Sequence, residues 1–128
     1  MRGLCYISAP LRLGDRTRNV NRAKALGRLA QRRGLAPIVV HVLGDVFDMD
    51  DKVAFECDLA IVSAVAKEGG VLWVLLTDEG SVTEGCRLEV EAYERSGGLM
   101  VVSKTWDQYR SRAVSLGLGD LWNSLEVT

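Results

Sequence analysis

The chain has 128 residues, 48% of them hydrophobic and 26% charged, which fits one globular domain and excludes disordered, collagen-like and low-complexity classes. Its net charge of −1 conceals an asymmetry, because residues 1–40 hold nine Lys and Arg against one acid, whereas residues 41–100 hold four against thirteen. The apolar runs fall well short of the roughly 20 residues that a membrane span needs. Residues 1–10 do not resemble a targeting signal, so a cytoplasmic domain without a membrane segment is expected.

The N-terminal third of the chain predicts a strand, a helix and a second strand. Residues 4–8 are a short apolar run, which is typical of a buried strand. Asp15 can cap the helix that follows, and Gly34 is expected to end it. The apolar face of this helix repeats at spacings of four, four and three, at Val20, Ala23, Gly27 and Ala30. Residues 37–42 carry successive β-branched residues and predict the second strand, with His41 near its C-terminal end.

The rest of the chain continues the alternation of helices and strands. Residues 51–67 are helical by length and alanine content, and residues 71–76 lack polar alternation, as in a strand that is buried on both faces. A further helix is expected at residues 81–96 and a fourth strand at residues 99–102. This order predicts one doubly wound α/β domain over residues 1–128, Rossmann-like or flavodoxin-like, with a parallel sheet of four to five strands flanked by helices.

Neither a metal nor a cofactor is expected. The cysteines are odd in number, lack CxxC spacing and are accompanied by a single histidine, which argues against a disulfide framework and a zinc site. They are Cys5, Cys57 and Cys86. Only His41 could activate Cys86 as a nucleophile, and a structural role for this cysteine is favoured. The loop before residue 51 is acidic but lacks the spacing and glycine of an EF-hand. Its acids, with the first residue of the next helix, are Asp45, Asp48, Asp50 and Asp51.

The candidate chemistry lies after the third predicted strand. Open parallel sheets bind ligands beyond the C-terminal ends of their strands, where helix N-termini direct their N–H groups. Residues 81–84 (SVTE) have the form of a capping box, and Gly85 then leaves room for a ligand to approach. Glu89 lies one turn further along and can project toward the same place. The alternative is an ordinary solvated glutamate. Its position beside Cys86 and Tyr93, away from the polar face of the helix, leaves both interpretations open.

Three segments in chain order resemble the nucleoside 2-deoxyribosyltransferase superfamily. Residues 4–12 (LCYISAPLR) are similar to its first strand and loop, and residues 34–42 (GLAPIVVHV) to the segment that holds its second strand. Residues 83–90 (TEGCRLEV) are similar to its signature, in which a small hydroxyl residue precedes a glycine and a glutamate follows that glycine by four positions. The resemblance extends to about residue 100 and departs from the family pattern at Ala9, where glycine is usual.

The resemblance implies roles for eight residues. Glu89 corresponds to the catalytic glutamate, which attacks the anomeric carbon of a nucleoside or nucleotide and forms a glycosyl ester; a carboxylate suits the oxocarbenium-like transition state. Tyr6 corresponds to the tyrosine that orients this glutamate. Asp58 is the best match for the second carboxylate, although it lies about one helical turn early, and an ordinary helix acid is the alternative. The implied substrate-binding residues are Ser8, Arg12, His41, Thr83 and Gly85.

An enzyme of nucleotide metabolism is therefore expected, either an N-glycosyl hydrolase or a (deoxy)ribosyltransferase acting on a nucleoside or nucleoside 5′-monophosphate. The alternative is a non-catalytic domain that binds or senses a nucleotide. The resemblance also implies a homodimer or higher homo-oligomer, with the Trp-bearing tail at residues 105–125 as the contact surface. Nucleic-acid binding is not expected, because the arginines surround their helix instead of forming one stripe.

Overall fold

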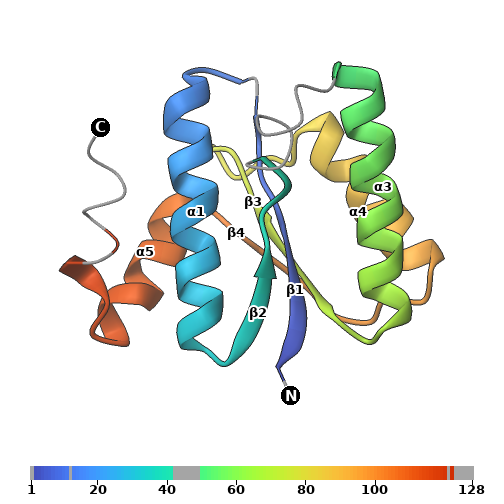
Figure 1. Ribbon diagram of the computed structural model, residues 1–128. Helices are drawn as coiled ribbons and strands as arrows, with labels where there is room; N and C mark the ends of the chain where they lie inside the picture. The colour runs from blue at the N-terminus through green and yellow to red at the C-terminus, as the bar shows by residue number, and fades with distance from the viewer. Residues whose placement is uncertain (1, 12, 42–49, 121, 123–128) are drawn as a thin grey trace.

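The computed structural model describes residues 2–11, 13–41, 50–120 and 122 (Figure 1). Its strands are β1 (Gly3–Ser8), β2 (Leu35–Ile38), β3 (Val71–Leu75) and β4 (Val101–Lys104). Its helices are α1 (Arg16–Arg32), α3 (Asp51–Lys67), α4 (Glu84–Arg95) and α5 (Trp106–Ser115). These four strands are parallel and lie in the order β2-β1-β3-β4. The predicted α/β fold, a parallel sheet flanked by helices, is confirmed.

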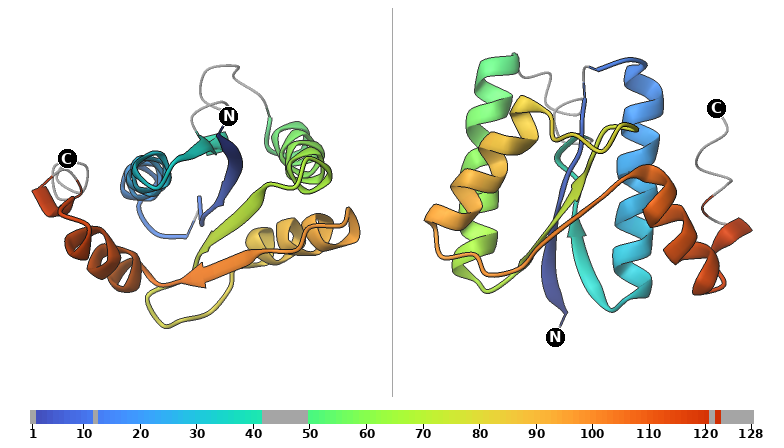
Figure 2. Two further views of the ribbon diagram at one scale, coloured as in Figure 1. Left: turned by 90° about the horizontal axis from the view of Figure 1, so that it is seen from below. Right: turned by 180° about the vertical axis from the view of Figure 1, so that it is seen from behind.

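The sheet lies between two helical layers, which Figure 2 shows from below and from behind. α1 and α5 pack on one face, and α3 and α4 pack on the other. Successive side chains of β1 point to opposite faces, so Cys5 and Ile7 join the core under α1 and α5, whereas Tyr6 joins the core under α3 and α4. Because both faces are covered, β3 is apolar throughout, as predicted.

The direction of winding reverses at β1. α1 leads from β1 to β2 on one side of it, and α3 precedes β3 on the other side. Crossovers that diverge in this way open a crevice beyond the C-terminal ends of the strands where they part, here β1 and β3. The fold therefore offers one favoured place for a ligand between these two strand ends.

The second strand begins and ends earlier than predicted. Gly34 has a φ of +83°, in the left-handed region that favours glycine, and it turns the chain from α1 directly into β2. β2 then pairs with residues 3–6 of β1. Val39 and Val40 are apolar because they pack against opposite core clusters, not because they extend the strand. The predicted limits, 37–42, were wrong, and His41 follows the strand instead of lying in it; residue 42 is outside the described residues.

The helix predicted at residues 81–96 begins later, at Glu84. A closed turn precedes it, in which the Thr77 N–H donates to the Ser81 carbonyl oxygen at 2.8 Å and the Ser81 N–H donates to Thr77 Oγ1 at 3.0 Å. Thr83 is the N-cap, because its side-chain oxygen accepts from the Cys86 N–H at 3.4 Å. The capping box predicted to start at Ser81 was wrong, since that residue belongs to the turn.

The fourth strand also begins later than predicted, at Val101 instead of residue 99. The Tyr93 hydroxyl donates to the Gly70 carbonyl oxygen at 2.6 Å and accepts from the Met100 N–H at 3.2 Å. A Cβ atom on Gly98 would lie 2.2 Å from Cε2 of Tyr93, so the chain passes against the face of this ring. The chain therefore joins the sheet at Met100, whose carbonyl oxygen accepts from the Leu72 N–H of β3 at 3.0 Å, and Leu99 is left 97% exposed.

The tryptophans of the C-terminal segment are used inside the chain. Trp106 stacks on Trp122 with ring centroids 4.4 Å apart, and both rings are buried. Tyr109 of α5 stacks on Trp73 of β3 at 5.9 Å and donates its hydroxyl to the Val74 carbonyl oxygen at 2.8 Å. The described part of residues 105–125 thus packs on the domain's own sheet. Its expected contact with a second copy stays a prediction.

Within the ranges that the structure describes, no helix combines the length and the apolar character needed to cross a bilayer.

Candidate functional site

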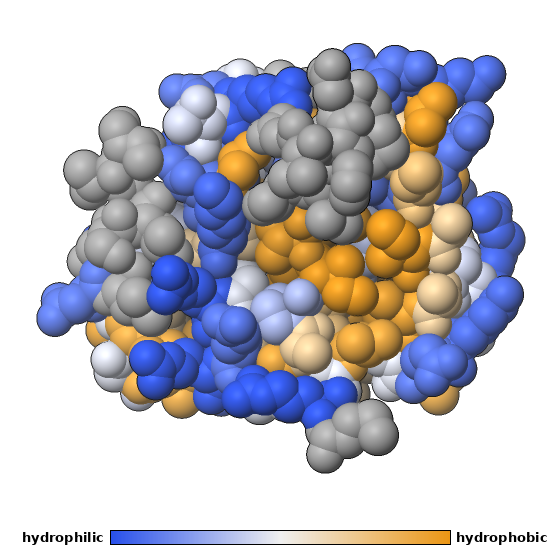
Figure 3. All heavy atoms as spheres, in the orientation of Figure 1, coloured by the Kyte–Doolittle hydropathy of each residue, from blue (hydrophilic) through white to orange (hydrophobic). Residues whose placement is uncertain are grey.

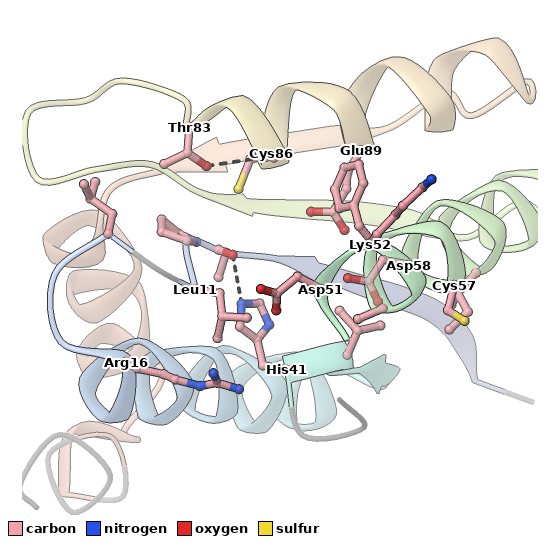
Figure 4. Close-up of a pocket in the computed structure, with 18 residues that line it drawn as sticks. Leu11, Arg16, His41, Asp51, Lys52, Cys57, Asp58, Thr83, Cys86 and Glu89 are labelled. Atoms are coloured by element: carbon pink, nitrogen blue, oxygen red, sulfur yellow. Dashed lines mark hydrogen bonds between the residues drawn. The ribbon is translucent and has the colours of Figure 1, made fainter. Parts of the chain in front are cut away.

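A cavity of about 780 Å³ opens at the predicted place, beyond the C-terminal ends of the strands. The β1–α1 loop, the start of α1, one face of α3 and the first turns of α4 all contribute to its walls (Figure 4). On the face shown in Figure 3, hydrophobic side chains gather between α1 and α3. The polar residues that line the cavity are Arg16, His41, Asp51, Lys52, Asp58, Thr83 and Glu89.

Glu89 is the most buried of the carboxylates at this cavity. It lies on the second turn of α4 and is 6% exposed. The other glutamates nearby are occupied elsewhere: Glu84 and Glu91 pair with Arg87 on the exposed side of the helix. This separation follows from helical periodicity, which places Glu89 with Cys86 and Tyr93 on the buried face. The interpretation of Glu89 as an ordinary solvated residue was therefore wrong.

Two hydroxyl groups of β1 hold this carboxylate. The Tyr6 hydroxyl donates to Oε2 of Glu89, and the Ser8 hydroxyl donates to Oε1 at 2.9 Å. Both donors can reach it because residues two apart on a strand point to the same face of the sheet, here the face under α4. Tyr6 and Ser8 are completely buried. The carboxylate is thus fixed in orientation by one bond to each of its oxygens.

Burial dominates the electrostatics of Glu89. Loss of solvation raises its pKa from 4.5 to about 7, the hydrogen bonds from Tyr6 and Ser8 oppose this rise, and the nearby charge of Asp58 adds to it. Burial, and after it the charge of Glu89, raises the pKa of Tyr6 well above its ordinary value of 10, so this phenol remains a donor. The site therefore holds a carboxyl group whose proton equilibrium lies near neutral pH, where catalytic carboxyl groups are often found.

Asp58 places a second carboxyl group at the same cavity. It projects from α3, is half-buried, and its pKa is raised by burial from 3.8 to about 6. The expected meeting of Asp58 and Glu89 at one cavity is therefore present, although the two come from different helices. Two carboxyl groups with separately shifted pKa values are an arrangement that can divide nucleophilic and proton-transfer roles.

The other predicted positions are placed as follows. Thr83 and Gly85 line the cavity at the start of α4, and a Cβ atom on Gly85 would meet only Phe55, at 4.0 Å. His41 also lines it, with Nε2 2.9 Å from the Ala9 carbonyl oxygen, so the ring connects the segment after β2 to the loop after β1. These three residues lie where a ligand in the cavity would touch them.

One predicted substrate contact, Ser8, does not lie at the cavity wall. Its hydroxyl donates a hydrogen bond to Glu89, because β1 directs this side chain toward the face of the sheet that α4 covers. It is a positioning residue in this geometry. Arg12 lies outside the described residues, as do Asp45 and Asp48.

Cys86 lies at the cavity but is buried, and loss of solvation raises its pKa although the hydroxyls of Ser8 and Thr83 oppose the rise. A thiol with a raised pKa is a poor nucleophile at neutral pH. The structural role favoured for Cys86 agrees with this environment. In the part of the chain that is described, no cluster of three or more His, Cys, Asp or Glu side chains is arranged to hold a metal ion.

Several residues that line the cavity were not predicted from the sequence. Arg16 begins α1, and Lys52 lies in the first turn of α3, so each stands at a helix start at the ligand-binding edge of the sheet. One face of α3 also lines the cavity, at Asp51, Ala54, Phe55, Asp58 and Ile61. A spacing of three or four residues on a helix face could have found them: counting back from Asp58 reaches Ala54 or Phe55 and then Asp51, and counting forward reaches Ile61.

Comparison with protein-family models identifies the relationship. The model of a family described as Domain of unknown function (DUF7768) matches residues 3–102. The chain belongs to this family. The match to DUF7768 runs from the start of β1 into β4, so it contains Tyr6, Asp58 and Glu89, whereas α5 lies beyond it. Comparisons with curated proteins and with solved structures give no match.

Proposed function

We propose that this DUF7768 domain cleaves or transfers the N-glycosidic bond of a nucleoside or nucleoside 5′-monophosphate, with Glu89 as the nucleophile. One observation carries the proposal: a buried carboxylate at the side of a ligand-sized cavity, held by a hydroxyl donor on each oxygen. Displacement at a sugar carbon needs a carboxylate fixed in one orientation beside the substrate. The resemblance to nucleoside 2-deoxyribosyltransferases supports the same assignment.

The reaction has two displacements. In the first, a carboxylate oxygen of Glu89 bonds to C1′ as the C1′–N bond breaks, and the bonding electron pair leaves on the base, which takes a proton. In the second, water or another base bonds to C1′ and the ester bond breaks, returning the electron pair to Glu89. The acceptor, whether water or the ring nitrogen of another base, loses a proton to solvent or to a basic group in the site as it bonds to C1′. Asp58, with a pKa of about 6, is the group at the cavity suited to exchange the proton with the leaving base.

The environment of Glu89 favours this chemistry in two ways. Positive charge develops on the sugar ring in an oxocarbenium-like transition state, and a negative group shielded from water attracts that charge more strongly than a solvated one. Its raised pKa, about 7, also makes the ionised carboxylate a stronger base than an ordinary glutamate. Both effects arise from burial, and the two hydroxyl donors keep a share of the group ionised.

The cavity suits a ligand of this class. Its volume, about 780 Å³, lies within the range of small-molecule sites. Arg16 and Lys52 bring positive charge to its wall, which would favour an anionic phosphate on the sugar. Arg12 remains a predicted phosphate contact. A cytoplasmic homodimer or higher homo-oligomer belongs to the same proposal, and a molar mass of at least twice the chain's in light scattering is the expected result.

A second candidate function, nucleotide binding without turnover, is favoured by the pKa of Glu89. A carboxyl group with a pKa of about 7 is largely protonated just below neutral pH, and in that form it donates a hydrogen bond to a ligand but does not attack it. In this case the cavity would hold a nucleotide and release it unchanged.

The two functions separate in one experiment. The chain is incubated with a panel of nucleosides and 5′-monophosphates, and released base is measured by chromatography. We expect release by the wild type and none by Glu89→Gln, with Glu91→Gln as the control because Glu91 lies on the same helix but pairs with Arg87 at the surface. Equal release by wild type and Glu89→Gln would contradict the proposal. A rise in melting temperature with a nucleotide but no released base would support binding alone.

A further inference from the structure

Phe55 is an aromatic side chain at the cavity that the proposed chemistry does not use. It comes from the second turn of α3 and is partly buried. Among the described residues that line the cavity, it supplies the only phenyl, phenol or indole ring. It belongs to neither of the two hydrophobic core clusters, and it is not among the partly buried side chains that pack against them. Packing within these two clusters of described residues therefore does not account for the position of this ring.

The ring lies between the two helices that carry the carboxyl groups. Phe55 and Asp58 are three residues apart on α3 and line the same cavity, so they share one face of that helix. On the opposite side, Cε2 of Phe55 would be 4.0 Å from a Cβ atom on Gly85, in the first turn of α4. Glu89 follows on the next turn of α4. The ring thus reaches from α3, which carries Asp58, to the start of α4, which carries Glu89.

A ligand part that contacts Asp58 must lie along this face of α3. The wall on either side of Asp58 is apolar, since Phe55 precedes it along this face of α3 and Ile61 follows it. A flat heteroaromatic ring fits such a wall, because its faces are apolar and stack on an aromatic side chain while its edge carries the nitrogen and oxygen atoms that a carboxyl group can bind. A sugar or a phosphate gains little from the same surface.

We propose that Phe55 is the specificity-determining residue of the cavity: its ring receives the heteroaromatic base of the ligand at the α3 wall. The identity of the ligand rests on the proposed function. The assignment of Phe55 adds that the base, not the sugar phosphate, is recognised at the α3 wall. Phe55 takes no part in bond making and acts through binding.

The test compares ligands with and without a base. Binding of adenosine 5′-monophosphate, cytidine 5′-monophosphate and ribose 5-phosphate to the full chain is measured by calorimetry or NMR titration. We expect Phe55→Ala to lower the affinity for whichever nucleotide the wild type binds more tightly, roughly tenfold, the size of effect that loss of one stacking contact gives. Phe55→Leu should weaken it less, because it keeps an apolar surface, and ribose 5-phosphate should bind all chains alike.

A matched control comes from the same helix. Leu59 is partly buried against the core under α3 and does not line the cavity. Leu59→Ala truncates an apolar side chain of α3, as Phe55→Ala does, but one that packs against the core, so it should lower the melting temperature without changing the affinity of either nucleotide. A loss of nucleotide affinity equal to that of Phe55→Ala would show that general loosening of α3 is the cause, and would overturn the proposal.

The outcomes distinguish this inference from the proposed function. Equal loss for nucleotides and ribose 5-phosphate, or no loss in Phe55→Ala, would overturn the role of Phe55 even where the wild type releases base. The expected binding pattern without any base release would overturn the glycosidic reaction and uphold Phe55. Failure of the wild type to bind either nucleotide would contradict both.

Discussion

The phenolic hydroxyl of Tyr6 donates a hydrogen bond to Oε2 of Glu89 and so joins β1 to α4 across 83 positions of sequence. Neither residue reaches the other by local structure; the sheet order places β1 beside β3, and α4 then brings Glu89 over the face to which Tyr6 points. The Ser8 hydroxyl completes the arrangement from the same strand. The fold thus creates a buried, oriented carboxyl group at the edge of the sheet where ligands bind.

Tyr6→Phe should separate positioning from binding. The phenyl ring keeps the core filled, but loss of the donor raises the pKa of Glu89 and leaves one of its oxygens unbound. An unsatisfied buried group of this kind costs about 1–3 kcal/mol, so we expect kcat for base release to fall about 10- to 100-fold. KM should change little, because Tyr6 does not line the cavity. Steady-state kinetics measure both.

Tyr93→Phe is the control for that substitution. Tyr93 lies on α4 and is also fully buried, but its hydroxyl binds backbone atoms of Gly70 and Met100, away from the cavity. The expected result is lower stability with kcat unchanged. A drop in kcat as large as that of Tyr6→Phe would show that any buried hydroxyl lost from this layer has the same effect, against a specific role for Tyr6.

The raised pKa of Glu89 predicts how stability depends on pH. The folded state keeps its proton up to about pH 7, whereas the unfolded state releases it near 4.5, so folding binds protons between these values. Stability from this group is therefore present below about pH 4.5 and is lost as pH rises to about 7, amounting to about 3 kcal/mol. Urea unfolding of wild type and Glu89→Gln at pH 5 and pH 8 measures it. Wild type should be less stable than Glu89→Gln at pH 8, and this deficit should shrink at pH 5; a constant difference would contradict the prediction.

Asp58→Asn should change the shape of the pH–rate profile. If ionised Glu89 attacks and protonated Asp58 supplies the proton, base release has a bell-shaped profile centred between about 6 and about 7, the pKa values of the pair. Asparagine cannot supply a proton, so the variant should be slower and should lose the fall in rate on the alkaline side. Rates measured across pH 5–9 test this. A profile that keeps both limbs would assign the alkaline limb to another group.

Gly98→Ala tests how the chain enters β4. Its Cβ atom would lie 2.2–2.4 Å from three ring atoms of Tyr93, which is fully buried and cannot move aside. Overpacking of this kind costs at least about 1–3 kcal/mol, which should appear as a clearly lower urea midpoint. Gly3→Ala serves for comparison, because its Cβ atom would meet only Leu35 at 3.7 Å. Equal midpoints for the two variants would contradict the packing described here.

The sequence was sufficient for those features that depend on periodicity. The strand and helix order and the apolar β3 were predicted, because each reflects a repeat along the chain, whereas the spacing left open whether Glu89 is solvated or part of a site. The limits of β2 and β4 were not predicted. Gly34 sets the start of β2, and the Tyr93 ring sets the start of β4. The direction of Ser8 was also missed. Its role depends on which helix covers that face of β1, and only the assembled fold determines this.

The central claim is that Glu89 forms a bond to the sugar. Its most direct test is the mass of the intermediate: the wild-type chain is mixed with the nucleotide from which it releases base, quenched rapidly in acid, digested and examined by mass spectrometry. We predict one added glycosyl group on the peptide that carries Glu89, and none in Glu89→Gln. An adduct on Asp58 or Cys86 instead, or undiminished base release by Glu89→Gln, would contradict the account.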